Sequence, residues 1–202
     1  MAEVKSPDEL RQSHRRLRAA LPQQTQQLHA EALCQRLLAI SALQHANHIA
    51  VYIAIRGEIS LEPTIKQLEH LGKVLYLPIL RGEAMHFAPW QSDGKLQKKG
   101  FGLLEPDVCE SQWKPAHELD LVLAPLVVFD SQCNRIGQGG GYYDRTFAFR
   151  ANQSTANPVL IGVAHEQQRE PQLPVESWDI PLDAIATNKA LYQRTELDEG
   201  SK

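Results

Sequence analysis

The stretch from Leu121 to Arg150 constrains the fold of this chain more than any other. An apolar run ends at Asp130, a polar turn follows, and the glycine-rich segment Gly137–Gly141 leads directly into two tyrosines. A strand that passes through glycines into a helix predicts an anion site, because glycine allows close backbone approach and the first helical amides point at the ligand. The alternative is a tight turn that the fold requires, and the local residues favour neither interpretation.

The glycine segment matches neither of two common nucleotide-binding motifs. It lacks the GxxxxGK[ST] spacing and contains no lysine, which excludes a Walker A loop. It also departs from GxGxxG, and no acidic residue ends a neighbouring strand at the distance that ribose binding needs. The nearby Arg135 and Arg145 favour phosphate as the anion. No serine stands in a GxSxG motif, so nothing indicates a covalent nucleophile.

The order of apolar and amphipathic segments predicts an α/β fold, a single three-layer α/β/α domain over residues 1–202 with a mostly parallel central sheet. Helices are expected within residues 6–40, the first with Ser6 as its N-cap and Glu9 completing a capping box. A polar, frayed tail is expected from about residue 188. Strands are expected at residues 48–55, 73–78, 85–90, 121–129, 158–164 and 184–187.

Composition restricts the classes of function. With 43% hydrophobic and 22% charged residues the chain is typical of a soluble globular protein, and its net charge of −3 argues against a nucleic-acid partner. No apolar run approaches the roughly 18 residues that a membrane span needs, and the N-terminus does not look like a signal peptide. Cys34, Cys109 and Cys133 form no metal-binding spacing. We therefore expect a cytoplasmic monomer that binds small molecules, and neither nucleic acid nor a membrane.

Three carboxylates are candidate site residues. Glu58 follows the end of an apolar strand, where open α/β sheets bind their ligands, although it is equally suited to capping the next helix. Asp144 and Asp179 are far apart in sequence, and they meet only if the segment around Asp179 folds over the helix expected after the glycines. One or two carboxylates are enough to hold Mg²⁺ on a nucleotide.

Residues 124–145, APLVVFDSQCNRIGQGGGYYDR, closely resemble the signature of the 5-formyltetrahydrofolate cyclo-ligase (methenyltetrahydrofolate synthetase) family. Asn134 stands where the family pattern has a glycine. The resemblance extends from about Leu10 to Thr187, because further family elements follow in the expected order. These elements are Gly57-Glu58, Tyr76-Leu77-Pro78, Phe101–Pro106 and Leu173–Asp179.

The resemblance implies an ATP- and Mg²⁺-dependent enzyme that converts 5-formyltetrahydrofolate to 5,10-methenyltetrahydrofolate and releases ADP and phosphate. In the family's mechanism the formyl oxygen attacks the γ-phosphate of ATP. N10 of the folate then attacks the activated carbon, and the ring closes as phosphate leaves.

The resemblance also implies a role for individual residues. Asp144 and Asp179 would hold magnesium, and we expect Arg145 and Tyr142 to take part in catalysis. ATP would contact Arg11, Arg135, Ile136, Gly137, Gln138, Gly139, Gly140, Gly141, Tyr142 and Tyr143. The folate would contact Ile53, Glu58, Phe101, Gln138, Gly139, Gly140, Gly141 and Tyr142.

The chain departs from the family at two basic positions. Pro7 and Gly140 stand where some members have lysine, so the missing charge would fall to Arg15, Arg16 or Arg145. Two other functions remain open. An ATP-independent enzyme related to sugar-phosphate isomerases or CoA-transferases would form no ADP, and a non-catalytic folate-binding protein would bind the folate without turnover.

Overall fold

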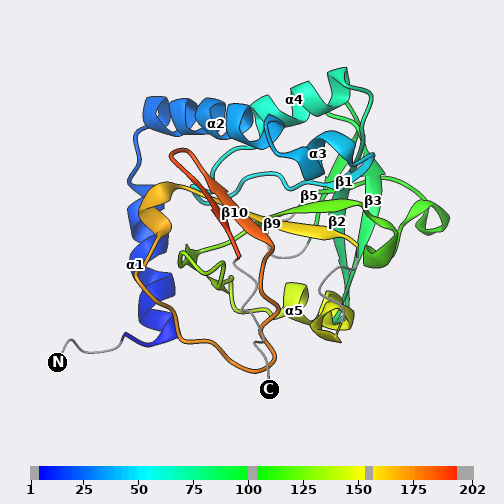
Figure 1. Cartoon of the computed structure of the whole chain (residues 1–202). Coiled ribbons are helices and arrows are strands. Elements are labelled where there is room, and N and C mark those ends of the chain that lie inside the picture. The colour runs from blue at the N-terminus through cyan, green and yellow to red at the C-terminus, as the bar shows by residue number, and fades with distance from the viewer. Residues whose placement is uncertain (1–4, 100–103, 153–156, 195–202) are drawn as a thin grey trace.

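The computed structural model of the chain describes residues 5–99, 104–152 and 157–194 (Figure 1). Within these ranges the centre is a seven-stranded sheet. In spatial order it consists of β11 (Leu191–Gln193), β10 (Ala184–Thr187), β9 (Val159–Ala164), β6 (Leu121–Pro125), β1 (His48–Ala50), β2 (Val74–Arg81) and β3 (Ala84–Trp90). All pairs from β10 to β2 are parallel, and β11 and β3 add an antiparallel strand at each edge. The prediction of a mostly parallel central sheet is confirmed.

Helices cover both faces of the sheet. On one face lie α2 (Gln23–Leu38), α3 (Ser41–His45) and α4 (Glu62–His70), and on the other α5 (Tyr142–Thr146) and the 3₁₀ helix η4 (Ala148–Asn152) (Figure 1). Leu33 and Leu37 of α2 are fully buried in one core cluster with Ile49 of β1, whereas Phe147 belongs to the cluster on the other face. Burial of such apolar surface is the main force that holds the three layers together.

Short elements complete the described chain. Two small hairpin pairings join β4 (Leu96–Lys98) to β5 (Leu104–Pro106) and β7 (Val128–Phe129) to β8 (Arg135–Ile136). Three 3₁₀ helices are η2 (Glu110–Gln112), η3 (Ala116–Glu118) and η5 (Glu166–Gln168). The cysteines Cys34, Cys109 and Cys133 are free. No helix in the described ranges is long and apolar enough to cross a membrane.

Helix α1 (Pro7–Ala19) lies across the edge of the sheet where its parallel strands end. Its start is as predicted, because Ser6 accepts the Glu9 backbone N–H and the Glu9 carboxylate accepts from the Ser6 backbone. The helix reaches the segments that follow three different strands: Arg18 donates to the carbonyls of Arg56 and Leu126, and Leu17 accepts from Gln167. Helix α1 therefore stands where open α/β sheets bind their ligands.

The strand predicted at residues 48–55 is wrong in its length. Strand β1 ends at Ala50, and only Val51 continues the ladder by donating to the carbonyl of Tyr76. The chain then leaves its neighbours and turns at Arg56 and Gly57, which both have positive φ angles of 51° and 75°. Residues with positive φ angles cannot continue the hydrogen-bond ladder of a β-sheet. The turn that they form places Glu58 at the edge of the sheet.

The strand predicted at residues 121–129 divides into two. Strand β6 ends at Pro125, which has no N–H to donate, and Val128–Phe129 pairs instead with β8 in a hairpin. The tail predicted from residue 188 is also wrong in part, because β11 extends the sheet to Gln193. Tyr192 anchors β11 through a 2.6 Å hydrogen bond to Glu166.

Candidate functional site

The glycine loop, defined as residues Gly137–Gly141, joins β8 to α5. Gly139 and Gly141 have φ angles of 100° and 64°, which L-residues with side chains rarely adopt. A Cβ atom at Gly141 would lie 2.6 Å from an Arg145 nitrogen, whereas no atom of the described residues lies within 4 Å of one at Gly137. The predicted helix after the loop has only five residues. The dipole of so short a helix attracts an anion only weakly. The positive charge that would hold an anion at the loop must therefore come from side chains.

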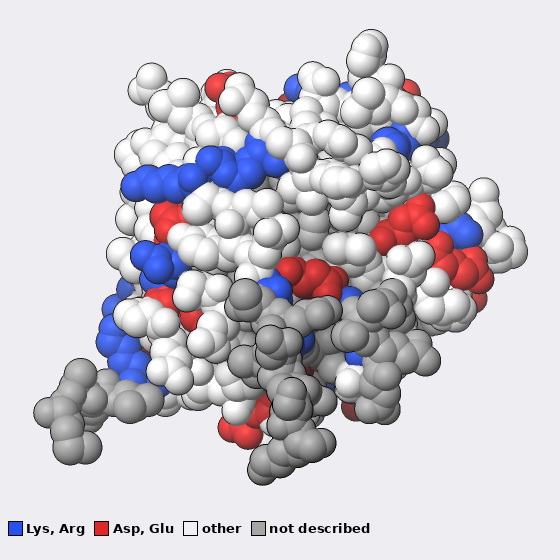
Figure 2. All heavy atoms as spheres, in the orientation of Figure 1, with Lys and Arg blue, Asp and Glu red and all other residues white. Residues whose placement is uncertain are grey.

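Two arginines of α1 supply such charge, because they stand one turn apart and both bind the glycine loop. Arg11 Nε donates to the Gly137 carbonyl at 3.0 Å. Arg15 donates from Nε and Nη2 to the Gln138 side-chain oxygen at 3.1 and 2.8 Å, and from Nη2 to its carbonyl. Basic side chains gather over α1 on the left of the molecule (Figure 2). The loop is therefore flanked by guanidinium groups without containing a cation itself.

Glu58 is buried directly beside this loop. Its Oε1 accepts from Gln138 Nε2 at 3.0 Å and from Arg18 Nη2 at 3.4 Å, and its Oε2 accepts from the Ile55 N–H at 3.2 Å. Arg18 is itself wholly buried and also donates to two backbone carbonyls. Burial raises the pKa of Glu58, and Arg18 and the two other donors partly counter this. The carboxylate thus sits in a dry, pre-formed position.

The segment that carries Asp179 lies against Asp144. The Ile180 N–H donates to Asp144 Oδ1 at 3.3 Å, and Arg135 bridges the two segments by donating to Asp144 at 2.6 Å and to the Ile180 carbonyl. Asp179 accepts the Glu176 N–H with one oxygen. The other oxygens of Asp144 and Asp179 accept no hydrogen bond from the described residues. A carboxylate oxygen that accepts no hydrogen bond can serve as a ligand for Mg²⁺, which prefers oxygen ligands and keeps phosphate and water in its other positions.

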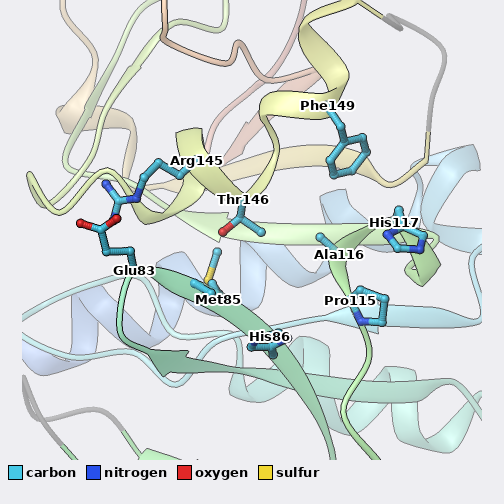
Figure 3. Close-up of a pocket in the computed structure, with 10 residues that line it drawn as sticks. Glu83, Met85, His86, Pro115, Ala116, His117, Arg145, Thr146 and Phe149 are labelled. Carbon is cyan, nitrogen blue, oxygen red and sulfur yellow. The ribbon is translucent and has the colours of Figure 1, made fainter.

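Tyr142 and Arg145, the residues expected in catalysis, lie together at the far end of the glycine loop. The Arg145 guanidinium stands 5.0 Å from the centre of the Tyr142 ring, and the Tyr142 hydroxyl donates to the Gly82 carbonyl. Arg145 also lines a cavity of about 430 Å³, with Glu83 near it and His117 and Phe149 at the opposite end (Figure 3). These two side chains lie against the last two glycines of the loop, where a Cβ atom at Gly140 would meet the Tyr142 ring and one at Gly141 would meet Arg145.

The remaining predicted residues differ in how far the structure describes them. Ile53 is half-buried and packs against the core cluster that contains Leu33 and Ile49. Tyr143 stacks on Phe147, and burial raises the pKa of its hydroxyl, so the hydroxyl stays protonated. Ile136 is buried, and its carbonyl accepts the Val127 N–H. Phe101 lies outside the described residues.

Sequence reasoning missed the part that Arg18 plays. Arg11, Arg15 and Arg18 follow one another by four and three residues, which places them on one helical face. That spacing was a usable signal, yet a basic face is more often solvated than buried. The decisive partners, Glu58 and Leu126, lie 40 and 108 positions away along the chain.

The chain is similar to known proteins over most of its length. The model of the 5-formyltetrahydrofolate cyclo-ligase family matches residues 3–188. The 5-formyltetrahydrofolate cyclo-ligase of Haemophilus influenzae is 34% identical over 177 residues, which are 86% of this chain and 93% of that protein. The protein of that name from Escherichia coli K12 is 34% identical over 88% of this chain and 97% of its own.

Solved structures agree with these sequence matches. The NMR structure of Aquifex aeolicus 5,10-methenyltetrahydrofolate synthetase superposes with a TM-score of 0.79 at 27% identity, covering 97% of this chain and 95% of that one. A 5,10-methenyltetrahydrofolate synthetase from Mycoplasma pneumoniae gives a TM-score of 0.72 at 22% identity and covers 92% of this chain, which supports the fold alone.

Proposed function

The chain belongs to the 5-formyltetrahydrofolate cyclo-ligase family, and we propose that it closes the ring of 5-formyltetrahydrofolate to 5,10-methenyltetrahydrofolate while ATP is converted to ADP and phosphate. The substrates are small molecules, and both halves of the site lie within one chain, which supports a monomer. A cytoplasmic location would suit such a reaction.

One observation carries the proposal. Gln138 belongs to the glycine loop and donates to Glu58 at 3.0 Å, so the loop suited to phosphate and the carboxylate suited to the pterin N–H groups are direct neighbours. Transfer of a phosphoryl group to the formyl oxygen requires the two substrates to meet in such a way. Phosphoryl transfer depends mainly on positioning and on neutralisation of charge.

The proposed reaction divides into two steps. In the first, the formyl oxygen attacks the γ-phosphorus, an O–P bond forms, and ADP leaves. In the second, the N10 lone pair attacks the formyl carbon and a C–N bond forms, N10 gives up its proton to the solvent, and the C–O bond breaks as phosphate departs. Glu58 would hold the pterin ring, and Arg11, Arg15 and Arg145 would neutralise the phosphates around the loop.

Magnesium would bind at Asp144 and Asp179, whose free oxygens suit it as described above. A bound Mg²⁺ supplies positive charge against the β- and γ-phosphates. Asp144 already accepts from Arg135 at 2.6 Å. Arg135 would therefore orient this carboxylate for the ion, and Ile180 would join the Asp179 segment to it.

ADP formation tests the proposal against its alternatives. The purified protein should release ADP from ATP and Mg²⁺ only when 5-formyltetrahydrofolate is added, in equal amount to the folate consumed. Conversion of a substrate without any ADP would favour the ATP-independent isomerase-like enzyme. Tight folate binding without turnover, with ATP and Mg²⁺ present, would favour the binding protein.

A further inference from the structure

The Glu58 carboxylate has two donors of different character on the same oxygen. Arg18 is wholly buried, and its other nitrogens bind the Arg56 and Leu126 carbonyls at 3.2 and 3.1 Å, so it is fixed. Gln138 is an exposed residue of the glycine loop. Because Gln138 Nε2 has no second partner among the described residues, Gln138 is the donor that can leave.

Substrate recognition requires that one donor leaves. A carboxylate accepts about four hydrogen bonds, two on each oxygen. Oε1 of Glu58 already has two and Oε2 has one, from Ile55. A pterin ring presents two neighbouring N–H donors and needs a free position on both oxygens. Gln138 therefore holds a place that the pterin must take.

Arg15 fixes Gln138 in this blocking orientation. Its Nε and Nη2 both donate to Gln138 Oε1, at 3.1 and 2.8 Å. Since an amide oxygen accepts and an amide nitrogen donates, this contact turns Nε2 toward Glu58. The guanidinium that would otherwise serve a phosphate is thus occupied in the same hydrogen-bond chain.

We infer that Arg15 is a positioning residue that couples the nucleotide and folate ends of the site through the Gln138 side chain, an inference that rests on the proposed function. A polyphosphate draws Arg15 away, Gln138 loses its orientation, and Glu58 becomes free for the pterin. A pterin that displaces Gln138 releases Arg15 in turn. Each ligand therefore tightens binding of the other, and linkage requires the two effects to be equal.

Calorimetric titration of 5-formyltetrahydrofolate with and without ADP and Mg²⁺ tests the coupling. ADP is the probe because it lacks the γ-phosphate that would touch the formyl oxygen directly. The wild-type protein should bind folate about fivefold more tightly, or better, when ADP is present. Arg16→Met is the matched control, since Arg16 is exposed and makes no hydrogen bond to the loop in the described chain, and it should keep the full effect.

Arg15→Met and Gln138→Leu should both lose the coupling, with ADP changing the folate affinity by less than about twofold. Without ADP both should bind folate at least as tightly as the wild type, because Gln138 is either absent or no longer held against Glu58 by Arg15. Thermal unfolding checks that each variant is folded. Because the two substitutions lie on different elements, the test can still be made if one of the variants does not fold.

Three outcomes would overturn the inference. They are a full ADP effect in both variants, weaker binding of folate alone by Gln138→Leu than by the wild type, and wild-type binding of both ligands without mutual effect. A folded wild-type protein that binds neither ligand would overturn the proposed function itself, and the two failures are therefore distinct.

Discussion

At the scale of single residues, Arg18 and Glu58 are the most consequential pair in the site. Both side chains are almost wholly buried, at 0% and 6% exposed, and their closest N and O atoms are 3.4 Å apart. A buried ion pair adds little net stability, but removing one partner leaves an uncompensated charge. The main effect of the pair is therefore to hold the Glu58 carboxylate in place at the sheet edge, and its contribution to stability is secondary.

Arg18→Met should lower the free energy of unfolding by about 3 kcal/mol, because Glu58 would remain buried without its cation. The pKa of Glu58, already raised by burial, should rise further. Chemical denaturation measures the first effect. Adding Glu58→Gln to Arg18→Met should restore part of the stability, and a double variant as unstable as the sum of both single changes would contradict the pairing.

Glycine is needed at Gly141 for two separate reasons. Its φ of 64° is strained for alanine, and a Cβ there would meet the Arg145 guanidinium. Gly141→Ala should destabilise the protein by about 1 kcal/mol or more in thermal unfolding. Gly137→Ala is the matched control, as it has neither problem, and it should leave stability unchanged or slightly raised. Equal losses for the two variants would refute this explanation.

At the scale of elements, α1 is the support of the site. One helix carries the two arginines that bind the glycine loop and the third that holds Glu58, and it contacts segments after β1, β6 and β9. Any loss of order at its start would reach Arg11 first, one turn inside the helix. Helix capping should therefore influence the affinity for phosphate.

Ser6→Ala removes the side-chain half of the α1 capping box and should destabilise the protein by about 1 kcal/mol. Affinity for ADP should fall with it, because Arg11 lies in the loosened turn. Ser13→Ala is a matched control in the same helix, where Ser13 only bonds back to the Leu10 carbonyl. If Ser13→Ala cost as much stability as Ser6→Ala, the capping argument would be wrong.

The elements that could be predicted from sequence are those with local signals. The capping box of Ser6, the helical stripe of α2 and the apolar strands all rest on residues close together in the chain. The end of β1 and the hairpin of Val128–Phe129 depend on which strands pair with these residues in the folded sheet. Sequence patterns of neighbouring residues do not contain that information, so neither feature could be predicted from them. In the site, the signature around Gly137–Gly141 identified the loop, but the Arg11 contact spans 126 positions.

At the scale of the whole molecule, a buried histidine should make the free energy of unfolding fall at acid pH. His165 is wholly buried after β9, and burial together with His29, 2.9 Å away, lowers its pKa to about 4. A base whose pKa is lower in the folded than in the unfolded state contributes stability above the unfolded pKa. That stability is lost as the pH falls through the folded pKa.

Stability should therefore decline between about pH 6.5 and pH 4, by up to about 3 kcal/mol from this group. Denaturant titrations at several pH values measure the slope. His165→Gln should flatten this part of the curve, whatever its effect on absolute stability. The exposed His70 gives the control variant His70→Gln, which should keep the wild-type slope; an unchanged slope in His165→Gln would exclude His165 as the cause.

The central claim concerns the whole site, which brings a glycine loop flanked by arginines against a buried carboxylate. Its most direct test is to mix the purified protein with 5-formyltetrahydrofolate, ATP and Mg²⁺ and follow 5,10-methenyltetrahydrofolate by its absorbance. We expect product only when all three components are present, and none with Glu58→Ala at equal concentration. A folded wild-type protein that binds ATP and yet forms no methenyl product would contradict the account.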